Sequence, residues 1–274
     1  MAIYDSKGGL VRELSSKPNE DVKEPPPNVP DYWLALPRHL TKQEGENRFV
    51  WNLRYAPPLA LRHQYAISAL YQNTPADPQG GLVVPGMYEV RLTVDGKVYK
   101  QPFEVTLDPR VHVTADALNH QLDLHRKASA VITATYNFYH QSLVLREAIA
   151  GDEKKLQNQD QDTVKTLRDF DMKVGRLQGA EGRGGAPGAG RSVPSFMMAN
   201  QQMGSLATVV DSSDSEPTPA METAYRDYCH DLASVADKWN GLIKQDLPMI
   251  NDQLAKQKLS SLPAVEISLP SECQ

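Results

Sequence analysis

The chain has 274 residues, 40% of them hydrophobic and 23% charged, and a net charge of −5. This composition is ordinary for a folded protein with room for two domains, and the acidic balance gives no electrostatic reason to expect a nucleic-acid partner. No apolar run approaches the ~20 residues that a membrane span needs, and the first residues, MAIYDSKGG, lack the apolar segment of a signal peptide.

Two β-hairpins are predicted in the first part of the chain. Residues 2–14 place a Ser-Lys-Gly-Gly turn between two short apolar runs, and residues 83–105 alternate apolar and polar side chains. Asp95 and Gly96 supply the second turn, because this dipeptide tolerates the positive φ of a tight hairpin. Pro102 cannot donate a ladder hydrogen bond, so its strand is expected to bulge or to lie at a sheet edge.

The segment between the hairpins carries less regular signals. Residues 16–31 combine prolines with charges, which is typical of an extended connection. Residues 32–36 and 48–55 are predicted as strands, and the alternation along the second one places Trp51 in the core. Residues 56–82 are expected to form a long loop that is too apolar to be disordered.

After Asp108 the apolar period changes from two to between three and four, which indicates helices. Thr114 is the expected N-cap of the first helix, and Gly151 with Asp152 is expected to end it. Pro248 is expected to kink or end the last helix. The spacing of apolar residues predicts the further helices over residues 156–177, 197–209 and 221–242.

These patterns predict a multidomain protein in which an all-β part is followed by an all-α part. Residues 1–110 are expected to form a β-sandwich with long proline-bearing insertions, and residues 111–259 an antiparallel bundle of three or four helices. Residues 179–192 form a Gly-rich loop within the bundle, and residues 260–274 an extended tail.

No catalytic, cofactor or metal site is predicted from the motifs. Residues 185–192, GAPGAGRS, match a phosphate-binding loop only with Arg191 in place of lysine, and the predicted flanks are helix and loop instead of strand and helix. His120, His125 and His140 lack the spacing that puts two imidazoles on one helical face, and His125 is interpreted as a core or interface residue.

The cysteines are few. Cys229 and Cys273 are the only two in the chain. Two thiols are too few for a disulfide framework and neither has metal-ligand neighbours, so the sequence leaves their redox state open.

Aromatic residues provide the candidate binding surface. Trp33, Tyr65 and Tyr71 are candidates for a platform that binds a sugar or a partner protein, with packing as the simpler interpretation. Tyr65 and Tyr71 belong to the long loop, where exposure and burial are equally compatible with the sequence.

Three blocks, IYDSKGGLVREL, GENRFVWNLRY and VVPGMYEVRLTVDGKVYKQPFEVTLDPR, resemble an immunoglobulin-like module of the flagellar hook-capping type. More closely, they are similar to the region after the β-propeller in bacterial sortilin-like or BNR-repeat proteins, which are often labelled glycosyl hydrolases and in which a helical bundle follows. Asn52 stands where that family has an aspartate. The resemblance implies an immunoglobulin-like β-sandwich and a secreted parent protein, periplasmic or extracellular. It does not imply catalysis, because this chain has none of the propeller's Asp-boxes.

The resulting hypothesis is a non-catalytic accessory or interaction module that contacts the parent's β-propeller or another protein. Two alternatives stay open. The first is that the chain is part of a glycoside hydrolase, which requires two carboxylates converging in a sugar-sized cleft. The second is that it is a carbohydrate-binding module, which requires coplanar exposed aromatic rings. None of these readings includes a cofactor.

Overall fold

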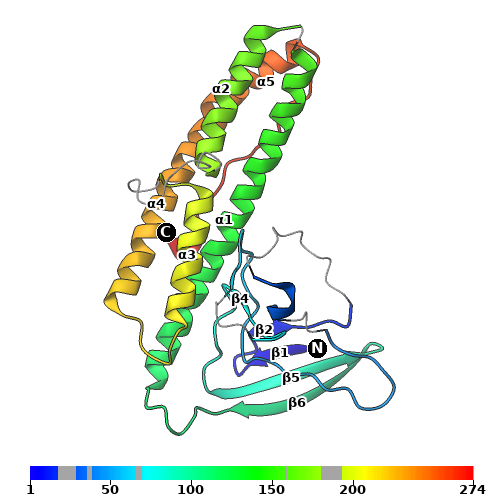
Figure 1. Ribbon diagram of the computed structural model, residues 1–274, viewed down its shortest axis with the longest axis vertical. Coiled ribbons are helices and arrows are strands. Elements are labelled where there is room, and N and C mark those ends of the chain that lie inside the picture. Colours follow the sequence, from blue (N-terminus) through cyan, green and yellow to red (C-terminus); the bar gives the residue numbers. More distant parts are fainter. Residues whose placement is uncertain (18–28, 36–38, 66–69, 158, 180–192, 274) are drawn as a thin grey trace. The chain divides into compact units, whose positions relative to one another are not determined.

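The computed structural model describes residues 1–17, 29–35, 39–65, 70–157, 159–179 and 193–273 (Figure 1). The chain forms two compact units. The first, called here the sheet unit, consists of Met1–Ser129 and Gly204–Glu222. The second, the helical unit, consists of Ala130–Met203 and Thr223–Gln274.

The strands are β1 (Ala2–Asp5), β2 (Leu10–Glu13), β3 (Gln64–Tyr65), β4 (Ala76–Asp77), β5 (Gly86–Val94) and β6 (Lys97–Val105). The α-helices are α1 (Ala115–Leu156), α2 (Gln161–Gln178), α3 (Phe196–Val210), α4 (Pro219–Gly241) and α5 (Leu247–Lys256). Short 3-10 helices span Asp31–Trp33 and Ser271–Cys273, and a π-helical turn, η2, spans Leu242–Asp246.

Both predicted hairpins are confirmed, and they combine into one antiparallel sheet. Its strand order is β2-β1-β5-β6, so the strand that contains Pro102 is an edge strand, as expected. Asp95 and Gly96 form the turn with φ values of 49° and 79°. On one face of the sheet, Ile3 and Tyr88 belong to a buried apolar cluster.

The prediction of an immunoglobulin-like sandwich, all-β and followed by a separate all-α part, is wrong. The structure is 49% helical and 14% strand, and its described residues form no clear sandwich. Residues 48–55 contribute a single bridge between Arg54 and Leu82, and residues 31–33 form a 3-10 turn instead of a strand. Loop side chains therefore cover the sheet where a second sheet was expected. Among them is Trp51, which packs against Tyr88 at a ring distance of 6.2 Å.

The predicted helices are present, and one predicted helix end is misplaced. The backbone N–H of Ala117 donates to Thr114 Oγ1 over 3.2 Å, which confirms Thr114 as the cap of α1. The predicted break at Gly151 is wrong, because α1 continues to Leu156. A helical glycine costs only ~1 kcal/mol, and buried Ile149 and Leu156 on either side outweigh that.

The last helix is interrupted where the proline signal predicted. The π-helical turn η2 lies directly before Pro248, which stands in the first turn of α5. Proline lacks an N–H, and its ring clashes with the carbonyl four residues earlier in a regular helix. The wider π-helical turn accommodates the proline, so the helical path continues from α4 into α5.

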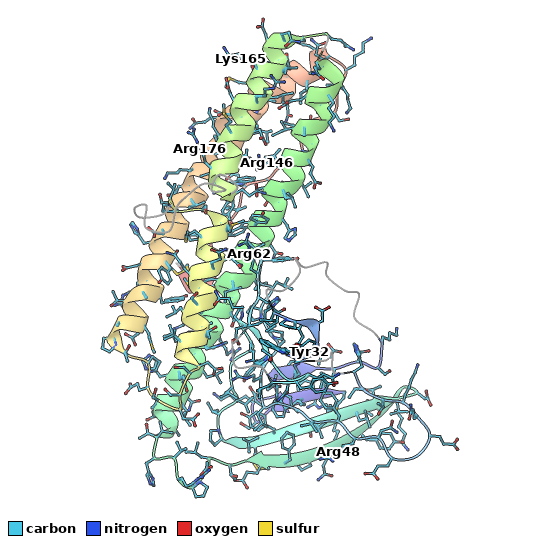
Figure 2. All side chains as sticks on the ribbon, in the orientation of Figure 1. Tyr32, Arg48, Arg62, Arg146, Lys165 and Arg176 are labelled. Carbon is cyan, nitrogen blue, oxygen red and sulfur yellow. A yellow bond between two sulfur atoms is a disulfide. The ribbon has the colours of Figure 1, made fainter. Side chains whose placement is uncertain are left out.

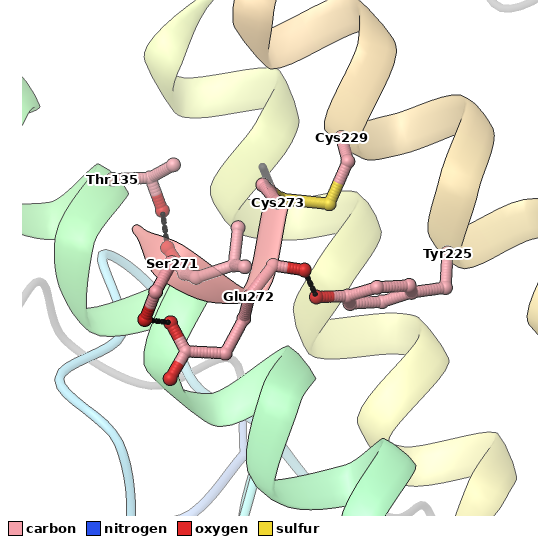
Figure 3. Close-up of a disulfide and its surroundings, with 7 residues drawn as sticks. Thr135, Tyr225, Cys229, Ser271, Glu272 and Cys273 are labelled. Carbon is pink, nitrogen blue, oxygen red and sulfur yellow. Dashed lines mark hydrogen bonds between the residues drawn. A yellow bond between two sulfur atoms is a disulfide. The ribbon is translucent and has the colours of Figure 1, made fainter. Parts of the chain in front are cut away.

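The helical unit has a dense apolar core and holds its C-terminal segment by specific bonds. Phe196 and Trp239 are fully buried, with ring centroids 5.8 Å apart. Trp239 Nε1 donates to the carbonyl of Val265 over 3.0 Å. A disulfide joins Cys229 on α4 to Cys273, and the Tyr225 hydroxyl donates to the Glu272 carbonyl (Figure 3). This cross-link answers the question that the two cysteines had left open.

Candidate functional site

Two of the three predicted aromatic residues lie on segments that the backbone joins. The N–H of Gln72 donates to the carbonyl of Tyr32, and the N–H of Thr74 donates to the carbonyl of Trp33, each over 2.9 Å. Tyr71 therefore stands on a turn that is tied to the segment carrying Trp33. We call Tyr32, Trp33 and Tyr71 the aromatic turn surface.

Hydrogen bonds between Thr74 and Leu70 close the turn that carries Tyr71. Thr74 is almost fully buried, and its hydroxyl exchanges hydrogen bonds of 3.2 Å with the backbone of Leu70. Gln72 adopts a positive φ of 51°, which turns the chain outward. Tyr71, which precedes Gln72 on this turn, is 73% exposed.

The rings of this surface differ in exposure and orientation. Tyr32, which is labelled in Figure 2, is 60% exposed. Trp33 is half-buried, and the ring planes of Tyr32 and Trp33 stand at 87° to each other. Tyr65, the third predicted residue, lies in β3, where it pairs with Ala76 and not with the segment of Trp33. Sequence reasoning took Tyr32 for a strand residue and missed it, although its position beside Trp33 was the available signal.

A groove of about 650 Å³ lies in the same unit. Its wall combines aromatic, amide and charged side chains, among them Phe49, Trp51, Asn52, Asn73, Gln79 and Arg12. Leu70, the first residue of the Tyr71 turn, also lines it. Glu13 is the single carboxylate among the described lining residues, so this groove does not present the carboxylate pair that glycoside hydrolysis uses.

A buried polar cluster fixes the loop around Arg54. Its guanidinium forms an ion pair with Asp211 and donates to the carbonyl of Gly80 over 2.9 Å. The side chains of Arg54 and Asp211 are only 16% and 12% exposed. Both charges are thus neutralised within the fold, which is the arrangement expected of a structural pair.

His125 lies beside that pair and is 2% exposed, in agreement with its interpretation as a core residue. Burial lowers the pKa of His125, while the charge of Asp211 opposes the shift. Its Nδ1 lies 3.3 Å from the hydroxyl of Ser129, one turn further along α1. A Ser-His-Asp relay would need a carboxylate dedicated to the histidine, but Asp211 is engaged by Arg54.

Other sequence signals do not converge on a site. His120 pairs with Glu216 and Glu222, and the His140 ring packs on Tyr136. Within the described ranges, no group of three or more His, Cys, Asp or Glu side chains is arranged to hold a metal ion. The phosphate-loop-like residues 185–192 fall outside those ranges.

None of the helices in the described part has the length and apolar character to cross a membrane. Comparison of the chain with protein-family models, with curated proteins and with solved structures found no match.

Proposed function

We propose that this chain is a non-catalytic accessory or interaction module of a secreted sortilin-like or BNR-repeat protein, and that the aromatic turn surface contacts a protein partner. The observation that carries the proposal is that two exposed tyrosines, Tyr32 and Tyr71, lie on segments joined by backbone hydrogen bonds. Tyrosine is enriched at protein interfaces because it combines a large apolar area with a polar tip and little side-chain entropy.

Ring orientation favours a protein partner over a sugar. A sugar-binding platform needs rings that lie in one plane, whereas Tyr32 and Trp33 stand nearly perpendicular. An uneven aromatic ridge instead fits pockets on a protein surface, as interface hot spots do. The β-propeller of the parent protein is the partner that the sequence resemblance suggests.

The disulfide supports a location outside the reducing cytoplasm. Cystines persist in secreted and periplasmic proteins and are rare in the cytosol, where thiol systems keep cysteines reduced. The bond between Cys229 and Cys273 is formed by residues from α4 and the C-terminal segment, which also share hydrogen bonds. A secreted parent would meet this requirement.

The experiment is a binding titration of the chain against the β-propeller domain of a sortilin-like or BNR-repeat protein. The Tyr71→Ser variant is expected to weaken binding at least tenfold, which corresponds to roughly 1.4 kcal/mol. Tyr99→Ser is the matched control, because Tyr99 is 50% exposed and lies on β6, away from this turn in sequence and in strand pairing.

Two outcomes would reject the proposal. Equal binding by wild type and Tyr71→Ser would remove the turn from the interface. Binding of wild type to a glycan array, lost in Tyr71→Ser, would instead identify the chain as a carbohydrate-binding module.

A further inference from the structure

A second feature of the sheet unit is a half-buried cation without a carboxylate partner. Arg12 on β2 donates from Nη1 to the carbonyl of Tyr55 over 2.8 Å. No carboxylate in the described part of the chain lies within the 4.0 Å that defines an ion pair with it. Burial lowers the pKa of Arg12, and no carboxylate counteracts that shift. The described part of the fold therefore gives this guanidinium a neutral acceptor but no opposite charge to offset its desolvation.

A second guanidinium faces the same tyrosine. The Arg126 guanidinium carbon lies 5.3 Å from the centroid of the Tyr55 ring. Arg126 stands on the first part of α1, within the sheet unit, and among the described residues it likewise has no carboxylate within ion-pairing distance. Two positive charges thus flank one residue in a chain whose net charge is −5.

Five other arginines show what is missing here. In each case an aspartate or glutamate satisfies the guanidinium. These pairs are Arg54 with Asp211, Arg91 with Glu89, Arg110 with Asp108, Arg146 with Asp171 and Arg168 with Glu153. The contrast with Arg91 is the closest, because it also stacks on a tyrosine, Tyr4, but keeps its glutamate.

Both unpaired arginines line one cavity of about 430 Å³. The hydroxyl-bearing Ser129 and the glycine Gly81 also line it, and the exposed Leu10 adds an apolar side. Its volume falls in the range of sites for small organic ligands, about 300–1,000 Å³. Glu13 is the single carboxylate among the lining residues, and strand alternation directs it to the face of β2 opposite to Arg12.

We propose that this cavity binds the phosphate group of a small phosphomonoester, held between Arg12 and Arg126. A phosphomonoester carries a charge of about −1.5 to −2 near neutral pH and three acceptor oxygens, which matches two guanidiniums and the Ser129 hydroxyl. Guanidiniums bind such oxygens in a bidentate manner that lysine cannot reproduce. The apolar side contributed by Leu10 would contact the organic part of the ligand.

The test is isothermal titration of the intact chain with glucose 6-phosphate, inorganic phosphate and sodium acetate in low salt at pH 7.5. Glucose 6-phosphate is expected to bind, inorganic phosphate more weakly, and acetate not measurably. Arg126→Gln is expected to weaken binding at least tenfold, and because Arg126 is exposed this variant should remain folded. Arg12→Lys keeps the charge but loses the planar fork, and it should also weaken binding at least tenfold. Arg91→Gln is the control and should bind as wild type does.

Several results would overturn the site. One is the absence of any phosphate binding at 10 mM, roughly the weakest affinity that two charge-assisted contacts should give. Unchanged affinity in both Arg126→Gln and Arg12→Lys is another. Acetate binding as tight as phosphate binding would refute a site for a dianion. Equal affinity for inorganic phosphate and glucose 6-phosphate would refute the role of the apolar wall.

Discussion

Replacement of Cys273 by serine is expected to destabilise the helical unit by about 4 kcal/mol. The disulfide joins residues separated by 44 positions. In the chain-entropy model, a cross-link that closes a loop of that length lowers the conformational entropy of the unfolded state. This raises the free energy of the unfolded state by roughly 4 kcal/mol at 25 °C. Because whole domains are stable by only roughly 5–15 kcal/mol, this one bond would supply a large share of the total.

Urea unfolding of the oxidised chain, followed by the circular dichroism of its helices, measures the effect. With a slope of ~2 kcal/mol per M, the midpoint should fall by about 2 M in Cys273→Ser. The Cys229→Ser variant and the double variant should fall by nearly the same amount, because all three remove one shared bond. Wild-type protein kept in dithiothreitol should match them. Equal midpoints for oxidised and reduced wild type would refute the reasoning.

Three further predictions concern the loop around Arg54. Gly80→Ala should cost about 3 kcal/mol or more, seen as a lower thermal midpoint, because an added Cβ would lie 2.1 Å from the carbonyl oxygen of Tyr55. Arg54→Met should cost about 3 kcal/mol in urea unfolding by leaving Asp211 buried without a counter-charge, and the additional change Asp211→Leu should recover most of the loss. His125 has a lowered pKa in the folded state, so the unfolded chain binds more protons as the pH falls below about 6.5. Stability of the sheet unit should therefore fall as the pH drops below about 6.5, and His125→Gln should flatten that slope.

The sequence was most informative where structure depends on neighbouring residues. The hairpin of β5 and β6 follows from alternation and from the turn chemistry of Asp95 and Gly96, which act over a few residues. The N-cap at Thr114 and the π-helical turn that precedes α5 and its Pro248 also depend on neighbouring residues. These features could be predicted because each is decided by steric and hydrogen-bonding preferences within one turn of the chain.

Long-range packing defeated the prediction of a sandwich. Residues 48–55 alternate apolar and polar side chains as a strand does, yet only Arg54 forms a β-bridge. Trp51 packs against the core cluster of the sheet although its backbone is in a loop. Alternating apolar residues report which side chains will be buried, but not whether the backbone finds a strand partner. The disulfide was missed for the same reason, since 44 residues separate its cysteines.

The same distinction between local and long-range contacts decides how much of each candidate site could be predicted. Trp33 and Tyr71 could be named from residue type, but their association depends on backbone hydrogen bonds between segments that the sequence does not relate. Arg12 and Arg126 could not have been found at all, because they share Tyr55 across more than a hundred positions and no spacing rule joins them.

Two arginines that hold the same loop show why charge pairing separates structure from function. Arg54 donates to the backbone at Gly80, and Arg12 donates to the backbone at Tyr55, so both stabilise the chain where these segments meet. The fold supplies Asp211 to neutralise the first guanidinium, yet no described carboxylate neutralises the second. If Arg12 served only the backbone contact, a neutral donor such as glutamine would do so without the cost of desolvating a charge. The half-buried guanidinium of Arg12 is therefore the residue on which the proposed phosphate site depends most.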